Sequence, residues 1–275
     1  MLKNLMKEVL KLSELLEKIC NTAKNAGKMI LEGSEKIQAL KIDNKSGHGN
    51  YVTEYDKKVQ ELLYRELSAI LPEANFVGEE NGQEVFKEEY HRGYTFVIDP
   101  IDGTTNFIKG WNESVTSIGL LKDSEPYIGV IYNPFSDWLY YAEKGQGAFM
   151  NGKPIHTSED PLIDTLIIMG TAPYYEDLTD RAFILGREAV RRSVDIRRGG
   201  SAATDICRLS SGQAGMFFEL RLGLWDYTAA AAILLEAGGE IMDIKGNPLT
   251  YDRPSSVVAL SKGVSKEDAA WVFDN

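Results

Sequence analysis

Asp99-Pro-Ile-Asp-Gly-Thr-Thr-Asn-Phe107 follows directly on Tyr94-Thr-Phe-Val-Ile98, a run of β-branched and aromatic residues. Such a run predicts a strand, and we expect the strand to end with the run. Pro100 then stiffens a tight turn, on which the carboxylates of Asp99 and Asp102 converge on one point. Two carboxylates that converge in this way predict a cation site. Because Asp, Pro and Gly are common turn residues, the segment taken alone also fits a structural turn.

The residues after Asp102 predict an anion site beside the cation site. Gly103 allows a close approach of backbone. Thr104 and Thr105 begin a predicted helix, whose free N–H groups favour an anion. A cation and a phosphate therefore have adjoining sites within one segment of nine residues.

Further carboxylates can join these two. Glu79 and Glu80 follow a short predicted strand, and Asp226 opens a predicted helix. Two unit charges about 4 Å apart repel by roughly 4 kcal/mol at an effective dielectric near 20, so several carboxylates share a pocket only when they are protonated or bind a cation. An all-oxygen ligand set selects Mg²⁺ before Zn²⁺. Taken singly, Asp226 also fits a helix N-cap, and the two glutamates fit a solvated turn.

The rest of the chain predicts an α+β half, residues 1–150, packed on an α/β half, residues 151–275, in which helices and strands alternate. No Pro/Gly/Ser-rich linker separates the halves, so we expect a shared interface that holds the site. The polar stretch 41–51 predicts a loop. Expected helices are 2–33 with a stop at Gly33, 54–71, 180–192, 201–211, 226–237 and one from about 265; expected strands are 75–78, 94–98, 114–121, 127–132, 138–142, 166–169, 195–198, 214–220, 240–244 and 257–259.

The composition argues against several classes of protein. The chain has 41 acidic and 30 basic residues, and this net charge of −11 opposes non-specific binding to nucleic acid and to anionic membranes. Its two cysteines and three histidines stand at no metal-ligand spacing, which argues against a zinc site and a disulfide framework. Lysines and glutamates recur through the first 32 residues, so we expect no signal peptide and predict a cytoplasmic protein.

Taken together, the motifs resemble those of the inositol monophosphatase family. The segment 99–107 is similar to the first signature of that family, and Leu224-Trp-Asp-Tyr-Thr-Ala-Ala-Ala-Ala-Ile-Leu-Leu-Glu-Ala-Gly-Gly239 is similar to the second. Three shorter elements match in order: Val52-Thr-Glu-Tyr-Asp56, Val77-Gly-Glu-Glu80 and Gly200-Ser-Ala-Ala203. The resemblance runs from about residue 15 to 262 and implies a layered αβαβα sandwich of the inositol monophosphatase and fructose bisphosphatase type.

This resemblance implies Mg²⁺-dependent, lithium-sensitive hydrolysis of a small phosphomonoester by a water that the metal activates, and it implies a homodimer. The implied water-activating pair is Thr104 and Asp56, with Asp56 accepting a hydrogen bond from the threonine. The implied metal ligands are Glu79, Asp99, the Ile101 carbonyl, Asp102 and Asp226. The implied substrate contacts are Asp102, Gly103, Thr104, Gly200, Ser201, Ala202, Glu219 and Asp226.

The substrate stays open among several phosphate esters. Inositol monophosphate or a related polyol or sugar phosphate is expected, because a carboxylate at Glu219 accepts hydrogen bonds from vicinal hydroxyls; a surface glutamate is the alternative. Arg221 favours a second phosphate on the substrate or is a solvated arginine, and Thr171 is a further candidate contact. Fructose 1,6-bisphosphate, NADP, phosphoadenosine and histidinol phosphate are alternative substrates on this fold. A regulatory or binding protein that retains the fold is the alternative of another class.

Overall fold

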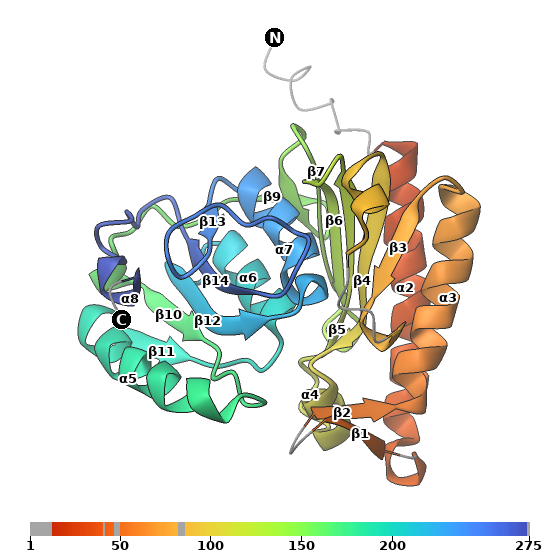
Figure 1. Ribbon diagram of the computed structural model, residues 1–275, viewed down its shortest axis with the longest axis horizontal. Coiled ribbons are helices and arrows are strands. Elements are labelled where there is room, and N and C mark those ends of the chain that lie inside the picture. Colours follow the sequence, from red (N-terminus) through yellow and green to blue (C-terminus); the bar gives the residue numbers. More distant parts are fainter. Residues whose placement is uncertain (1–12, 41, 47–49, 82–85, 274–275) are drawn as a thin grey trace.

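The computed structural model describes residues 13–40, 42–46, 50–81 and 86–273, which stack in five layers (Figure 1). Helices α2 (Glu14–Glu35) and α3 (Glu54–Ile70) cover one face of a seven-stranded sheet. Helices α6 (Ala202–Ser210) and α7 (Leu224–Glu236) lie between this sheet and a five-stranded one. Helix α5 (Glu176–Arg192) packs on the outer face of the five-stranded sheet. The predicted αβαβα sandwich is therefore confirmed.

The seven-stranded sheet is formed by residues 75–155, so its last strand lies beyond residue 150, and it has the order β3-β4-β5-β6-β7-β8-β9. Only β3 and β4 run parallel, and every later neighbour is antiparallel. The carboxyl ends of β3 and β4 therefore meet at one edge of the sheet. The strands are β3 (Asn75–Gly78), β4 (Tyr94–Asp102), β5 (Val115–Lys122), β6 (Glu125–Asn133), β7 (Trp138–Glu143), β8 (Ala148–Met150) and β9 (Lys153–Ile155).

The five-stranded sheet comes from the second half and has the order β11-β10-β12-β14-β13. Its first three strands in this order run parallel, while β14 is antiparallel to both of its neighbours. The strands are β10 (Leu166–Met169), β11 (Asp195–Arg197), β12 (Met216–Leu222), β13 (Glu240–Met242) and β14 (Ser255–Leu260). Within the described ranges, the short helices are α4 (Thr104–Lys109), α8 (Ala270–Phe273), η1 (Ile37–Ala39), η2 (Glu79–Asn81), η3 (Glu88–His91) and η4 (Leu162–Asp164).

Helix α7 is apolar on nearly all sides because other elements bury it on nearly all sides. Its residues from Tyr227 to Leu234 are buried, and it contacts five strands of the large sheet, β4 to β8, as well as α6. Glycines in the sheet let it approach closely: a Cβ on Gly119 would lie 3.0 Å from the backbone nitrogen of Ala229, and a Cβ on Gly129 would collide with the carbonyl oxygen of Ala229. This packing holds the start of α7 beside the end of β4.

Three predictions about helix ends and loops are wrong. Gly33 does not end α2, which continues to Glu35; the glycine gives room to the rings of Tyr55 and Phe107, which lie where its Cβ would be. The stretch predicted as a loop contains β1 (Ile42–Ser46) and β2 (Asn50–Thr53), which pair antiparallel although their sequence is largely polar. The helix predicted from about 265 begins only at Ala270, after a hydrogen-bonded turn.

The predicted first helix also extended over residues 2–12, which lie outside the described residues. Among the helices that the structure describes, none has the length and apolar composition that a membrane span requires.

Candidate active site

The carboxylates of Asp99 and Asp102 lie on strand β4 itself, so the prediction that the strand ends before them is wrong. Asp99 pairs with Ser117 of β5 and Asp102 pairs with Val115, so the register shifts by one residue between the two pairs. This shift is a β-bulge, which turns successive side chains away from strict alternation. The bulge explains how two carboxylates three positions apart on a strand face the same space.

Asp226 completes a carboxylate cluster, defined here as Asp99, Asp102 and Asp226. Each of these residues offers an oxygen within 4.8 Å of the others. Helix α7 begins at Leu224, two residues before the prediction, so Asp226 lies within its first turn rather than at the N-cap. Its Oδ2 accepts a hydrogen bond of 2.7 Å from the backbone N–H of Gly223. A carboxylate is favoured at a helix N-terminus, which explains how the chain holds a third acid here.

Burial and mutual repulsion make the cluster unfavourable in its fully ionised form. Burial raises the pKa of Asp99 and of Asp226 well above the usual value, and the neighbouring carboxylates raise both further. Burial also raises the pKa of Asp102 to about 6, although hydrogen bonds from Ser201 and Ala203 oppose the rise. A divalent cation removes this repulsion, and carboxylate oxygens are the ligands that Mg²⁺ prefers. The residues present therefore fit the expected ion.

Lys45 of β1 brings a positive charge to the edge of the site. Its Nζ lies 2.7 Å from Oε1 of Glu79 and 2.5 Å from Oε1 of Glu80. Glu79 directly follows β3, whose end adjoins that of β4. Burial and the charge of Glu79 raise the pKa of Glu80 to about 7, against the effect of Lys45. The hairpin β1–β2 is thus joined to the predicted metal ligand Glu79 by an ion pair that is largely shielded from solvent.

The predicted pair Asp56 and Thr104 lies together in the structure. Oγ1 of Thr104 lies 3.2 Å from Oδ1 of Asp56 and 3.1 Å from the carbonyl oxygen of Ile101. The other oxygen of Asp56 accepts hydrogen bonds of 2.7 Å and 2.6 Å from the backbone and side chain of Thr53, in a capping box at the start of α3. These bonds fix the Asp56 carboxylate with Oδ1 facing Thr104. Burial raises the pKa of Asp56, and its bonds to Thr53 oppose that rise.

Gly103 joins β4 to α4 in a conformation that other residues rarely adopt. Its φ is +87°, and a Cβ there would lie 3.0 Å from the Glu113 carbonyl oxygen and 3.3 Å from that of Gly200. Helix α4 follows at once, and the first N–H groups of a helix have no partner within it. Glycine therefore lets the turn 199–201 pack against the start of α4.

The turn from Gly199 to Ser201 is held from two sides. Nδ2 of Asn106 donates to the carbonyl oxygen of Gly199 at 2.9 Å. Oγ of Ser201 donates to Oδ2 of Asp102 at 2.7 Å, and the N–H of Ala203 donates to the same oxygen at 2.8 Å. The predicted substrate contacts Gly200, Ser201 and Ala202 thus lie directly beside the carboxylate cluster, with the Ser201 hydroxyl already engaged.

Glu219 faces the loop between β10 and α5. The N–H of Ala172 donates to its Oε1 at 3.1 Å, and its carboxyl group occupies the space where a side chain on Gly170 would be. Burial raises the pKa of Glu219 to about 7, and the positive charge of Arg198 opposes that rise. Thr171, in the same loop, accepts a hydrogen bond from Arg198.

Several residues at the site had no predicted role. Asn106 lies within the quoted segment, but its partner Gly199 is 93 positions away, so no local pattern indicates the bond. The pKa of Tyr174 is raised by burial and also by the charges of Asp226, Glu79 and Asp102, and its side chain bonds that of Thr105. Tyr174 therefore lies near the carboxylate cluster.

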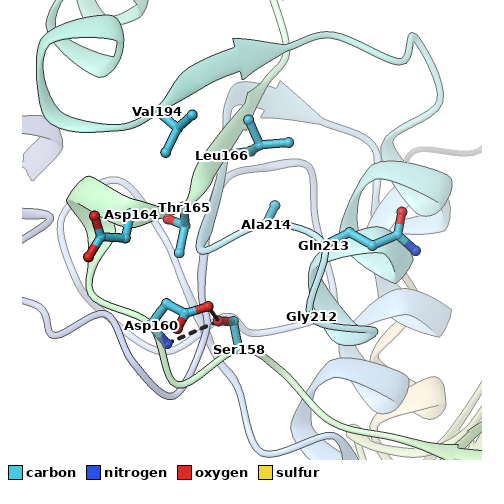
Figure 2. A pocket seen from close by; sticks show the side chains of 9 residues that line it. All are labelled: Ser158, Asp160, Asp164, Thr165, Leu166, Val194, Gly212, Gln213 and Ala214. Atoms are coloured by element: carbon cyan, nitrogen blue, oxygen red, sulfur yellow. Dashed lines mark hydrogen bonds between the residues drawn. The ribbon is translucent and has the colours of Figure 1, made fainter.

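A separate cavity lies away from these residues (Figure 2). It has a volume of about 170 Å³, and its lining includes Ser158, Asp160, Asp164 and Gln213. Leu166, the first residue of β10, also lines it, whereas Gly170 and Glu219 lie at the other end of the parallel strands. Ligands of α/β sheets bind at the carboxyl ends of the strands, so this cavity is not the predicted site.

Comparisons with known proteins agree with the geometry. The family model described as inositol monophosphatase family matches residues 11–273. An inositol-1-monophosphatase of Mesorhizobium japonicum is 33% identical over 262 residues, which cover 92% of this chain and 97% of the relative. The structure of the extragenic suppressor protein suhB from Bartonella henselae has a TM-score of 0.84 at 30% identity, covering 94% and 97% of the two chains. The inositol monophosphate-bound structure of SaIMPase-II, a staphylococcal protein, has a TM-score of 0.76 at 26% identity, covering 92% and 91%.

Proposed function

The chain belongs to the inositol monophosphatase family, whose members are phosphoric monoester hydrolases, and we propose that it hydrolyses a small polyol or sugar phosphate with Mg²⁺ as its cofactor. The observation that carries this proposal is the meeting of three buried carboxylates within 4.8 Å beside the start of α4. Inositol monophosphate is the first expected substrate, since the related SaIMPase-II has been crystallised with it.

Asp99, Asp102 and Asp226 would hold the metal, together with Glu79 and the Ile101 carbonyl. When bound, Mg²⁺ neutralises the carboxylates, draws charge from the phosphoryl oxygens and makes a nearby water more acidic. The side chain of Lys45 would supply a further positive charge beside Glu79. The chain thus offers only oxygen donors for the ion, with no histidine or cysteine among the residues of the cluster.

Thr104 and Asp56 can move the proton of the attacking water. The Thr104 hydroxyl has one proton and two acceptors, Asp56 and the Ile101 carbonyl. When it donates to Asp56, its oxygen can accept a proton from the water while its own proton passes to Asp56. The raised pKa of Asp56 suits this carboxylate to receiving a proton. The water oxygen then bonds to phosphorus as the bond from phosphorus to the alcohol oxygen breaks, and solvent protonates the leaving alkoxide.

The start of α4 and the turn 199–201 would orient the ester. Unpaired N–H groups at the start of α4 favour the phosphoryl oxygens. Gly103, with no side chain, lets the turn 199–201 pack directly against the start of this helix. The backbone of residues 200–202 and Glu219 would contact the leaving alcohol, because Ser201 bonds to Asp102 and the charge of Asp102 acts on Glu219.

A substrate panel ranked by kcat/KM tests this proposal. The panel contains inositol 1-phosphate, fructose 1,6-bisphosphate, NADP, phosphoadenosine phosphate and histidinol phosphate, each with Mg²⁺ and with or without Li⁺. We expect turnover of at least the first or second compound, and inhibition by Li⁺. A folded, Mg²⁺-binding protein without turnover on the whole panel would instead indicate a regulatory or binding protein.

We also propose that the chain forms a homodimer through the outer face of α5. Phe183, Ile184 and Val190 of this helix are 61%, 51% and 50% exposed. The first turn of α5 is acidic and its last turn is basic, so two copies packed antiparallel place opposite charges together. Light scattering should give twice the mass of the chain, and Phe183→Glu should give the monomer mass. A monomeric wild-type protein would contradict this proposal.

A further inference from the structure

Asp205 of α6 is a buried carboxylate that the proposed reaction does not use. It lies in the first turn of the helix and is 3% exposed. Among the residues that the structure describes, no lysine or arginine forms an ion pair with it, and Arg208 of the same helix pairs with Glu113 instead. Burying a carboxylate without a counter-charge is costly, so this position keeps a group that is unfavourable for folding. The contacts of its two oxygens indicate what the group does there.

Both oxygens of Asp205 lie against the backbone of Gly199. Oδ2 accepts a hydrogen bond of 3.1 Å from the N–H of Gly199. Oδ1 fills the space of the missing side chain, because a Cβ on Gly199 would collide with it. The carboxylate therefore fixes the position at which the turn 199–201 begins.

Asn106 of α4 holds the same glycine from the other side. Its Nδ2 donates to the carbonyl oxygen of Gly199 at 2.9 Å, and its Oδ1 lies 3.1 Å from the point that a Cβ on Gly200 would occupy. The N–H and the C=O of Gly199 are thus both bound. Gly200 has a φ of +82°, and two consecutive glycines have more conformational freedom than other residues. Asp205 and Asn106 together remove this freedom.

Asp102 holds the opposite end of the turn. Ser201 and Ala203 donate to its Oδ2, which fixes the chain where it enters α6. Since Asp102 is also a predicted metal ligand, this end of the turn is tied to the carboxylate cluster. The end at Gly199 is tied to Asp205 instead, and the backbone of Gly200 lies between the two attachments.

We propose that Asp205 is a positioning residue for hydrolysis, which holds the backbone at Gly200 in the orientation that the leaving alcohol requires. This inference rests on the proposed phosphatase function. Asp205 does not touch the ester and acts through the Gly199 peptide. A misplacement of about 1 Å can lower a rate about 10²-fold, so the loss of one buried hydrogen bond is sufficient for a measurable effect. An alcohol with hydroxyls that bind the turn should depend on Asp205, whereas an alcohol without them should not.

Steady-state kinetics with two esters test this role. Inositol 1-phosphate, or the polyol or sugar phosphate that the panel ranks first, has hydroxyls for the turn, and 4-nitrophenyl phosphate has none. We expect Asp205→Ala to lower kcat/KM for the polyol ester about 10-fold, chiefly through KM, and to change the value for the aryl ester by no more than about twofold.

Two further variants separate this role from a general loss of structure. Asp205→Asn keeps an oxygen that accepts from the Gly199 N–H, so it should retain at least about half of the wild-type kcat/KM for the polyol ester. Glu113→Gln breaks the ion pair with Arg208 but keeps the backbone carbonyl that Asn106 binds, so it should behave as wild type on both esters.

Hydrogen exchange of the backbone amides, followed by NMR in the metal-free protein, gives a readout independent of turnover. The Gly199 amide should exchange about 10-fold faster in Asp205→Ala than in Asp205→Asn, and the Ala203 amide, which donates to Asp102, should exchange equally in both. Equal losses on both esters, no loss on the polyol ester, or an unchanged Gly199 amide would overturn the role of Asp205 while leaving the phosphatase function in place. A wild type that releases phosphate from neither ester would overturn both.

Discussion

The hydroxyl oxygen of Thr104 lies 3.2 Å from Oδ1 of Asp56, although the two residues are 48 positions apart in the chain. The bond joins the first residue of α4 to the first turn of α3. Two helix starts thus meet beside the carboxylate cluster, where a proton acceptor is needed for hydrolysis.

Removing the Thr104 hydroxyl should stop proton transfer while leaving the phosphate site in place. We expect Thr104→Ala to lower kcat by about 10²- to 10⁴-fold with little change in KM. Thr104→Ser keeps the hydroxyl and should retain most of the activity. Stopped-time phosphate release with each variant measures both constants. A Thr104→Ala variant with wild-type kcat would show that the water loses its proton elsewhere.

Mg²⁺ should stabilise the folded protein more at high pH than at low pH. In the metal-free protein the pKa values of the cluster are raised, that of Asp102 to about 6, so protons occupy the cluster at low pH and compete with the ion. The Mg²⁺-induced rise in Tm should therefore grow between about pH 5.5 and about pH 8. Asp226→Asn should reduce this rise, and Asp164→Asn, in the separate cavity, should not. A rise in Tm that is independent of pH would contradict the assignment.

Asp205 should make the protein less stable as pH rises. Burial raises its pKa to about 7, although the N–H of Gly199 donates to its Oδ2 at 3.1 Å. Because the folded pKa lies above the unfolded value, this group's favourable contribution is present below the unfolded pKa, near 3.8, and is lost as pH rises through about 7.

Asp205→Asn stays neutral and should remove that loss. We expect its free energy of unfolding to exceed that of wild type by about 1–3 kcal/mol at about pH 8 and to match it near about pH 4. Urea denaturation at several pH values measures the difference. The same difference at every pH would mean that Asp205 does not bind a proton on folding.

Gly103 should tolerate no side chain. The φ of Gly103 is +87°, and a carbonyl oxygen lies 3.0 Å from the position of a Cβ. We therefore expect Gly103→Ala to lower the free energy of unfolding by about 2–4 kcal/mol and to lower the activity. Gly110 is a matched control, because its φ is +66° but no atom lies within 4 Å of its Cβ position. Gly110→Ala should lower the free energy of unfolding by only about 1–2 kcal/mol. Equal losses in both variants would attribute the effect to φ alone.

The sequence predicted many individual helices and strands because its periodic patterns are local, whereas the layered arrangement followed from the resemblance to the family. The β-branched run before Asp99 and the apolar run of α7 each indicate one element, and both elements are present. The bulge that unites Asp99 with Asp102 was not predicted, because it depends on the pairing of β4 with β5. The hairpin β1–β2 was missed for a similar reason, since its residues lack the alternation of a half-buried sheet.

The candidate site was predicted in part. Its acidic residues stand in recognisable motifs, and the structure brings Asp99, Asp102 and Asp226 together. The contacts that position their neighbours join distant segments: Asn106 reaches Gly199, and Lys45 reaches Glu79. Arg197 and Arg198 look alike in sequence, and only the three-dimensional arrangement shows that Arg197 pairs with Asp195 while Arg198 donates a hydrogen bond to Thr171.

The most direct test is phosphate release from inositol 1-phosphate and fructose 1,6-bisphosphate by wild type and Asp99→Asn, in EDTA and across a Mg²⁺ titration. Circular dichroism checks that both proteins are folded. We expect wild-type activity to be absent in EDTA and to rise with Mg²⁺, and Asp99→Asn to stay inactive at every concentration because the cluster has lost a ligand charge. Full activity of the wild type in EDTA, or of Asp99→Asn in Mg²⁺, would contradict a metal-dependent phosphatase centred on these carboxylates.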